Sequence, residues 1–318
     1  MLKVSRLALP CLLAAAILTG CAATSKKEAQ NLPPMPEKIT AFEDGVPVLE
    51  VYVAQTKQIE KMTLEEYLCG VLAGEMKSDW PMEALKAQAI LARTFVLKFM
   101  TEKESKYGGA DISTDIEEAQ AYDAQAVNEH IRQAVEETRG KVLSANAELP
   151  YAWFHAHSGG KTARAKEGLN WKDPEPGYTR VADGREGDDA PADASQWRAE
   201  FSAGEVIAAA KAAGVAIDAL DAVAVGDTGE SGRATTLRLG NQDVNAPDFR
   251  IAIGSTAMRS TFLTDLRLEG GRVIMEGKGF GHGVGMSQWG AYALANGGMP
   301  AEKIVLEYFT NVEVVKMY

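Results

Sequence analysis

The chain has 318 residues, a hydrophobic fraction of 46% and a formal net charge of −11 at pH 7. A hydrophobic fraction of this size is ordinary for a globular protein and excludes wholesale disorder. An acidic chain is a poor match for the phosphate backbone, so we expect no nucleic-acid partner.

Residues 1–20 have the pattern of a signal peptide. Lys3 and Arg6 precede an apolar run from Leu7 to Leu18, which is shorter than the roughly 20 apolar residues that a transmembrane helix needs. The run leads into Leu-Thr-Gly and then Cys21, the pattern of a lipoprotein cleavage site, so we expect the Cys21 thiol to carry a lipid. An ordinary secretory signal with an incidental cysteine is the alternative.

The stretch after Cys21 is polar, contains three prolines and lacks apolar periodicity. We interpret residues 21–45 as the lipidated cysteine and a flexible tether. The globular part is then expected outside the cytoplasm, anchored to a membrane that is either inner or outer. Because Cys11 leaves with the signal, only Cys69 remains as a thiol, and we expect neither an intramolecular disulfide nor a cysteine-rich metal site.

The next hundred residues alternate between strand and helix signals. Val48 to Val53 alternates like a strand, with Gln58 to Met62 as its pairing partner. Thr63 and Glu66 form a capping box that begins a helix ending near Glu75. A second helix starts around 78–81, with Asp79 near its N-cap and Pro81 in its first turn, and a third is predicted over 119–139, closed by Gly140.

The rest of the chain is read as short strands with a few helices. We predict strands at 141–144, 151–157 and 312–316, a hairpin joining 222–225 to 234–239, and a helix over 289–296. Residues 183–193 form an acidic loop without a pattern. The sequence therefore predicts an α+β fold, with a single mixed domain over 46–318.

Glu75 is the carboxylate with the most unusual expected environment. It follows Val71 by four residues and Leu72 by three, so it lies on the apolar face of its helix. It also stands at the helix C-terminal end, where the macrodipole disfavours negative charge. Both effects raise the pKa of a carboxyl group, as general acid catalysis requires. A glutamate at a frayed helix end, reaching solvent, is the alternative.

A second candidate site is the segment from Gly277 to Gln288, in which glycine occupies every second position five times. In an extended conformation this pattern leaves one face bare for the close approach of a ligand such as a sugar ring. A glycine-rich loop packed against another strand is the alternative. No dinucleotide or phosphate-loop register fits, so we expect no cofactor.

A third candidate site contains His155 and His157, two residues apart on a strand. Together with His282 they offer three imidazole ligands for a metal, whereas polar residues at a strand end are the simpler reading, and we predict no metal. The neighbouring Ser158 and Thr162, around two glycines, are candidates for hydrogen bonds to a ligand.

Three segments resemble the stage II sporulation protein D (SpoIID) family, whose other branch includes the LytB amidase enhancers. The segments are Leu64 to Thr94, with Gly-Glu-Met and Trp-Pro-Met at its centre, Phe154 to Thr162, and Gly277 to Ala291, which reads GKGFGHGVGMSQWGA. The resemblance spans roughly residues 48–315, and the glycine motif is its most specific part.

The resemblance implies a peptidoglycan lytic transglycosylase that cleaves the bond between N-acetylmuramic acid and N-acetylglucosamine, with Glu75 as catalytic acid. Glu75 would protonate the glycosidic oxygen and then act as a base while the muramyl hydroxyl closes an anhydro ring. A helical pair would carry this acid, and short antiparallel strands would form the glycan groove. The substrate-binding residues suggested by the motifs are Lys86, Arg93, Ser158, Lys161, Thr162, His282, Ser287 and Gln288.

Two alternatives stay open beside this enzyme. Asp79 is either a helix cap or a second carboxylate, and the whole chain is either a transglycosylase or a non-catalytic amidase enhancer that binds peptidoglycan, with a cell-wall amidase as partner. Some relatives hold zinc through cysteines after the second helix, but residues 111–122 contain none, so no zinc is expected there. Whether stem peptides must first be removed from the glycan stays an open question.

Overall fold

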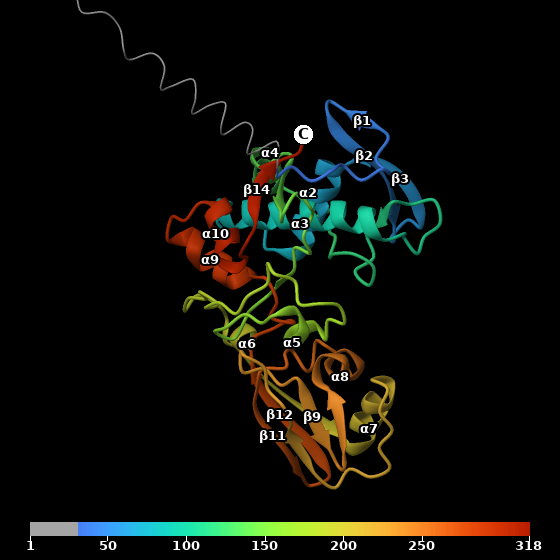
Figure 1. Ribbon diagram of the computed structural model, residues 1–318, viewed down its shortest axis with the longest axis vertical. Helices are drawn as coiled ribbons and strands as arrows, with labels where there is room; N and C mark the ends of the chain where they lie inside the picture. Colours follow the sequence, from blue (N-terminus) through green and yellow to red (C-terminus); the bar gives the residue numbers. More distant parts are fainter. Residues whose placement is uncertain (1–30) are drawn as a thin grey trace, which may run out of the picture.

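The computed structural model describes residues 31–318, and the predicted signal peptide and Cys21 lie outside them. Within these residues, helices alternate with short, mostly antiparallel strands (Figure 1), which confirms the α+β prediction. Among the described helices, none is both long enough and apolar enough to cross a membrane.

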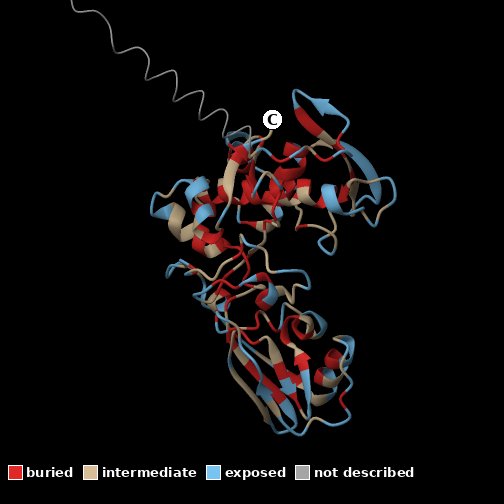
Figure 2. Ribbon diagram, in the orientation of Figure 1, coloured by how far each residue is buried: buried red, intermediate tan, exposed pale blue. Residues whose placement is uncertain are grey.

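Two helices form the centre of the first lobe. α2 (Leu64–Glu75) begins at the predicted capping box, in which the Thr63 hydroxyl accepts from the Glu66 amide and the Glu66 carboxylate accepts from the Thr63 amide. α3 (Met82–Glu102) is the longest helix that the structure describes. Both helices contribute fully buried leucines, valines and alanines to one hydrophobic core. Figure 2 shows these buried residues gathered along the two helices.

Short elements from both ends of the chain cover this helical pair. The predicted hairpin is confirmed, because β2 (Val46–Val53) pairs antiparallel with β3 (Gln58–Thr63). From the C-terminal part come α9 (Gln288–Asn296), α10 (Ala301–Tyr308) and β14 (Glu313–Lys316), and β14 pairs antiparallel with β5 (Lys141–Ser144). The two remaining strands on this side are β1 (Phe42–Glu43) and β4 (Ile112–Ser113).

Residues 31–45, predicted as part of the tether, lie on the domain. The Asn31 side chain donates a hydrogen bond to Glu313, the Asn31 carbonyl accepts one from the Ser144 hydroxyl, and Ile39 is buried in the first core. A run of prolines favours an extended backbone, and here that extended segment is held by contacts with the terminal strands.

Two predicted helix features are wrong. α3 has Pro81 as its N-cap with no side-chain cap, so Asp79 does not cap the helix. The third helix is much shorter than predicted, because α4 (Glu129–Glu137) starts only after the Asn128 side chain caps it and ends at Thr138. Residues 119–128 instead form an irregular segment against the end of α2, where a Cβ on Gly74 would clash with the Tyr122 backbone.

A second hydrophobic core, formed by residues between Trp197 and Met275, lies in a second lobe. β7 (Gln196–Ser202) enters this second lobe, and β12 (Arg272–Lys278) returns beside it, with β11 (Leu263–Glu269) on the outer edge. A separate sheet of β8 (Val223–Val225), β9 (Thr236–Leu239) and β10 (Gln242–Asn245) confirms the predicted hairpin. α7 (Ala203–Ala212) and α8 (Ala246–Ile253) complete this core.

Irregular segments connect the two lobes. They contain two short helices, α5 (Ala165–Leu169) and α6 (Ala192–Ser195), and one parallel pair, in which β6 (Phe154–His155) lies beside β13 (Met286–Ser287). The predicted strand over 151–157 is therefore reduced to two residues. This parallel pair brings two of the family-like motifs together.

The alternating glycines do not form an extended strand. Gly279, Gly281, Gly283 and Gly285 all have positive φ angles, between 73° and 112°. Their bare faces are filled by protein: a Cβ on Gly285 would lie 2.0 Å from the Trp153 carbonyl oxygen. The segment is thus a glycine-rich loop packed on the main chain of residues 153–159, and the open face expected for a ligand is wrong.

Candidate active site

Glu75 is the last residue of α2, and its side chain is half-buried at the wall of an open groove. The groove has a volume of about 620 Å³ and is lined by residues 73–79 and Ala126. The Glu75 Oε1 atom accepts a hydrogen bond of 2.7 Å from the Ala121 amide. The carboxyl group is therefore fixed in position, and it is not a frayed glutamate extending into solvent.

Burial raises the pKa of Glu75 above its ordinary value. Hydrogen bonds from the Ala121 amide and the Gln288 side chain act in the opposite direction but do not outweigh burial. The position at the C-terminal end of α2 disfavours the anion further. The protonated acid is thus favoured beyond the usual pH range of a glutamate, which is the property of a proton donor.

Gln288, the first residue of α9, lies against Glu75. Its side-chain amide donates to the Glu75 carbonyl oxygen at 3.3 Å. The next residue, Trp289, packs at 4.6 Å between ring centroids against Trp80, which follows Glu75 in the α2–α3 turn. The last residues of the glycine motif thus lie against the end of the helix that carries Glu75.

Glu186 is a second buried carboxylate, which the sequence did not reveal. It accepts a hydrogen bond from Ser287, the residue before Gln288. Glu186 Oε1 accepts hydrogen bonds from the Ser287 hydroxyl at 2.7 Å and from the Ser158 amide at 2.6 Å, and its side chain is only 6% exposed. Burial alone would raise the pKa of Glu186, but bonds from both serines and the nearby His157 outweigh it and lower the pKa.

Glu186 lies in the acidic loop that showed no pattern in the sequence. Its one local sign is a flanking glycine: a Cβ on Gly184 would come within 1.9 Å of the Glu186 carboxylate and 2.0 Å of the Ser158 hydroxyl. Because the partners of Glu186 are 28 and 101 positions away, helix or strand periodicity could not have identified it.

Several residues predicted to bind substrate instead hold the fold together. Arg93 is fully buried and forms two bonds to Glu65, of 3.0 Å from Nε and 2.5 Å from Nη2, which removes it from contact with a ligand. Lys86 is paired with Glu83 at 2.8 Å and also with Glu137.

The two hydroxyl candidates beside the histidines are likewise buried. The Thr162 hydroxyl donates to the Arg180 carbonyl and accepts from the Ala182 amide. Ser158 is fully buried, and its hydroxyl accepts from the Gly160 amide. Both therefore shape the loop around Glu186. Ser287 is likewise fully buried and bonded to Glu186, whereas Gln288 contacts Glu75.

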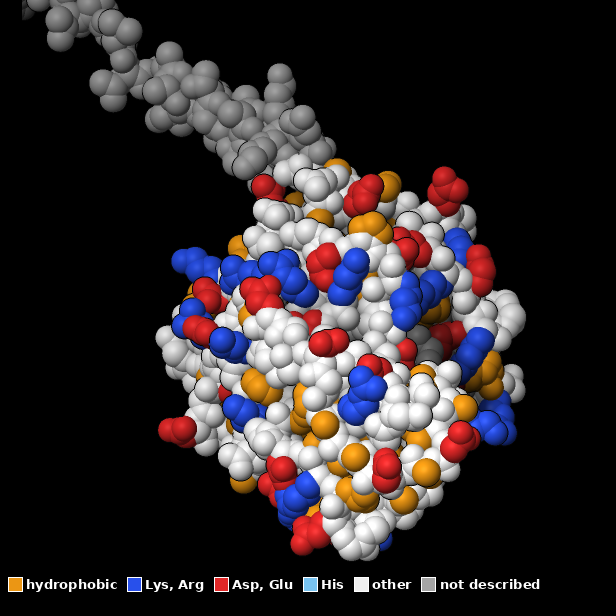
Figure 3. Space-filling view, turned by 60° about the horizontal axis from the view of Figure 1, so that its bottom comes forward, with side chains coloured by type: hydrophobic (Ala, Val, Ile, Leu, Met, Phe, Trp, Pro, Cys, Tyr) orange, Lys and Arg blue, Asp and Glu red, His pale blue; other side chains and the backbone are white. Residues whose placement is uncertain are grey.

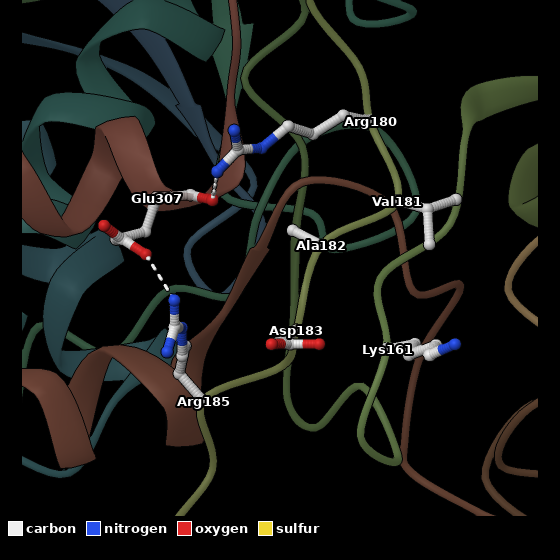
Figure 4. Close-up of a pocket in the computed structure, with 7 residues that line it drawn as sticks. All are labelled: Lys161, Arg180, Val181, Ala182, Asp183, Arg185 and Glu307. Carbon is white, nitrogen blue, oxygen red and sulfur yellow. Dashed lines mark hydrogen bonds and ion pairs between the residues drawn. The ribbon is translucent and has the colours of Figure 1, made fainter.

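Lys161 is exposed and lines a separate pocket of about 360 Å³. Figure 4 shows Arg180 and Arg185 directed at Glu307, while the Lys161 side chain points away from them. Arg185 is 3.2 Å from the Glu307 carboxylate, and Arg180 donates to the Glu307 carbonyl oxygen. Of the three cations predicted to bind substrate, Lys161 is thus the one whose side chain makes no hydrogen bond or ion pair within the described residues.

The three histidines do not converge on one point. The rings of His155 and His282 are 5.8 Å apart between centroids, and His157 instead faces Glu186. Burial, with the charges of Arg250 and Arg233, lowers the pKa of His282 to about 3, so its ring is neutral. Across residues 31–318, no group of three histidine, cysteine or carboxylate side chains is placed to hold a metal ion.

The molecular surface carries charges of both signs. Figure 3 shows acidic and basic side chains intermingled over the face that it presents. Such a mixture lacks the continuous basic stripe of nucleic-acid-binding proteins on that face.

Comparisons with known proteins find relatives over most of the chain. A family model described as stage II sporulation protein matches residues 52–144. Stage II sporulation protein D of Bacillus amyloliquefaciens is 30% identical over 282 residues, which cover 83% of this chain and 77% of that protein. Its counterpart from Bacillus subtilis is 27% identical, with 93% and 87% covered. A protein of Bacillus subtilis named amidase enhancer is 28% identical over 76% of this chain and 39% of its own length.

Proposed function

The chain belongs to the stage II sporulation protein D family, and from this premise we propose that it is a lytic transglycosylase acting on the glycan strands of peptidoglycan. The observation that carries the proposal is Glu75, a single half-buried carboxyl group with a raised pKa at the wall of an open groove. A glycosidic oxygen is a poor leaving group until it is protonated, and a carboxyl group whose pKa is raised keeps its proton to higher pH and can supply it.

The proposed reaction needs one carboxylate. Glu75 donates its proton to the oxygen between N-acetylmuramic acid and N-acetylglucosamine as the bond to the muramyl anomeric carbon breaks. The Glu75 carboxylate then removes the proton from the primary hydroxyl of the same muramyl unit, whose oxygen attacks the anomeric carbon and closes an anhydro ring. Because the nucleophile belongs to the substrate, the second carboxylate of ordinary glycosidases is not required.

The neighbours of Glu75 support this role. The Ala121 amide and Gln288 hold the end of α2 in place, and Ser287 is held in turn by Glu186. A proton donor fixed by its surroundings loses little entropy when it meets the substrate. Asp79 lines the same groove but is exposed at its rim, where it is available to the polar groups of a sugar.

We also propose a cellular location and a protein partner. The signal peptide and the lipid on Cys21 would place the domain in the cell envelope, next to peptidoglycan, with the membrane as its anchor. A cell-wall amidase is the proposed protein partner, because an amidase that strips stem peptides would supply bare glycan strands.

The experiment is digestion of purified peptidoglycan, with and without its stem peptides, followed by mass spectrometry of the new chain ends. Anhydro-muramyl ends support the proposal, and their yield from the two substrates shows whether peptides must be removed first. Reducing ends would mean hydrolysis, and would direct attention to Asp79, which lines the same groove, as the second carboxylate.

A non-catalytic amidase enhancer is the second candidate, favoured by the similarity to the protein that carries this name. Under this alternative the chain would bind glycan and accelerate a cell-wall amidase without cutting sugar bonds itself. A coupled assay with a purified amidase separates the two: acceleration that persists in a Glu75→Gln variant, with no glycan cleavage by the parent, would favour the enhancer.

A further inference from the structure

A second concave site lies at the other end of α3 from Glu75. It is a narrow pocket of about 110 Å³ between the last turns of α3 and the segment that leads into β6, and it is walled by five aromatic rings: Phe95, Phe99, Tyr151, Trp153 and Trp171. Glu75 precedes the first residue of α3, and the helix from Met82 to Phe95 is on the order of 20 Å long. The pocket is therefore a site of its own.

The rings in this pocket form a corner. Tyr151 and Trp153 stack with 5.0 Å between centroids and 12° between planes. Trp171 stands nearly perpendicular to both, at 66° to Tyr151 and 75° to Trp153. The stacked pair thus covers one face of each of its two rings, and the third ring stands across the pair.

Tyr151, Trp153 and Trp171 are only half-buried, although aromatic side chains of this size usually bury most of their surface when they are purely structural. Concave sites with aromatic walls and a few polar groups are the common form of small-ligand pockets. The indole nitrogen of Trp171 adds a further sign, because it is buried and makes no hydrogen bond within the described chain. Buried polar groups are normally paired.

Polar side chains stand at the rim of the pocket. The Tyr151 hydroxyl donates to Glu102, and Lys98 pairs with the same carboxylate at 2.5 Å while lying 4.7 Å from the Tyr151 ring centroid. Lys103 lies over Phe99 at 6.0 Å and is exposed. Within residues 31–318 its amine has no ion-pair partner, so the rim carries one uncompensated positive charge.

We propose that this pocket binds one anionic amino-sugar unit of a glycan strand. A pyranose ring has faces made of C–H groups, which pack on aromatic rings, and a girdle of hydroxyl and acetamido groups that needs polar partners. The aromatic lining of the pocket matches the C–H faces, and Glu102 at its rim matches the polar girdle. The free ammonium of Lys103 matches the carboxylate that a muramyl unit carries when its stem peptide is absent.

Other occupants fit this pocket less well. A nucleic-acid base would also pack on aromatic rings, but the net charge of −11 of the chain opposes a partner with a long run of phosphates. An apolar peptide segment would offer no counter-charge to the Lys103 ammonium at the rim.

The identity of the glycan rests on the proposed function, but binding does not depend on cleavage. A strand held in the pocket while another part lies beside Glu75 would stay attached between cuts. Binding of the strand at either site would then raise its effective concentration at the other site.

The test measures binding by the full chain in a Glu75→Gln background, so that no strand is cut. The probes are peptide-free glycan strands from purified peptidoglycan and neutral oligosaccharides of N-acetylglucosamine. Trp171→Ala is expected to weaken binding of both probes on the order of tenfold. Lys103→Glu, which changes an exposed side chain, is expected to weaken binding of the anionic strands alone, severalfold.

Lys211→Glu is the matched control, because Lys211 is an exposed lysine on α7 in the second lobe. It should bind both probes like the parent, and thermal melting shows that each variant is folded. If Trp171→Ala folds and binds like the parent, or if Lys103→Glu and Lys211→Glu have equal effects, the proposal is overturned. A parent enzyme that cuts nothing while pocket-dependent binding persists would contradict the proposed activity and leave the sugar site standing.

Discussion

The side-chain amide of Gln288 donates to the carbonyl oxygen of Glu75 at 3.3 Å, across 213 positions of sequence. This contact joins the end of the glycine-rich segment to the end of α2. These two motifs belong to one site although they lie far apart in the chain, because the glycine-rich segment holds the end of α2 where Glu75 lies.

Replacing the acid should make the protein more stable at neutral pH. Because burial raises the pKa of Glu75, the folded state holds this proton more tightly than the unfolded state, and stability is lost as pH rises through the interval between the two pKa values. Glu75→Gln removes that loss and keeps an oxygen acceptor for the Ala121 amide. We expect a higher Tm than the parent at pH 7 and equal Tm values at pH 3, where the acid is protonated in both states. A lower Tm at pH 7 would contradict the assigned environment.

Arg93 should matter for folding and not for substrate affinity. Arg93→Met leaves the Glu65 carboxylate buried without its cation, which costs about 3–5 kcal/mol of unfolding free energy. The Glu65→Gln/Arg93→Met double variant should recover part of this loss, because the charge is then absent from both partners. Urea denaturation of the single and double variants measures the difference. Equal stability of Arg93→Met and the parent would refute the buried pair.

Gly285 should tolerate no side chain. Its φ angle of 73° already disfavours other residues, and a Cβ would collide with the Trp153 carbonyl. The matched control is Gly298, which has a φ angle of 82° but open space around it. Gly298→Ala should cost about 1–2 kcal/mol for the backbone conformation alone, and Gly285→Ala clearly more. Equal losses in chemical denaturation would show that the close approach is unimportant.

Glu186 should act on catalysis through Ser287. Glu186→Ala leaves the buried Ser158 amide without its acceptor, at about 1–3 kcal/mol, and frees Ser287 beside Gln288. Glu186→Gln retains an oxygen acceptor. We therefore expect kcat for glycan cleavage to fall in Glu186→Ala and to be largely restored in Glu186→Gln, with KM nearly unchanged in both. A loss as severe in the Gln variant would instead mean that the charge of Glu186 is itself required.

Local signals in the sequence predicted those elements whose determinants are close together in the chain. The capping box at Thr63 and Glu66, the β2–β3 hairpin and the helix after Ser287 depend on residues within a few positions of one another, and the structure confirms them. The position of Glu75 on the apolar face of α2 also follows from helical spacing alone.

Features that depend on distant partners were missed or misread. The third helix was predicted from residue 119, but Ala121 and Tyr122 instead pack on Gly70 and Gly74 of α2. Arg93 looked like a ligand-binding cation because its partner Glu65 is on another helix. The glycines looked like a bare strand because alternation does not reveal φ angles, and the second hydrophobic core was not foreseen because its strands carry no linker at their borders.

Cleavage of peptide-free glycan strands by the parent, Glu75→Gln and Asp79→Asn proteins is the most direct test of Glu75 as the catalytic acid. Both variants exchange a carboxylate for an amide in the same groove, so they differ only in which carboxyl group is lost. We expect anhydro-muramyl products from the parent and from Asp79→Asn, and a loss of about 10²–10⁴ in rate for Glu75→Gln. Undiminished cleavage by Glu75→Gln would contradict this role of Glu75.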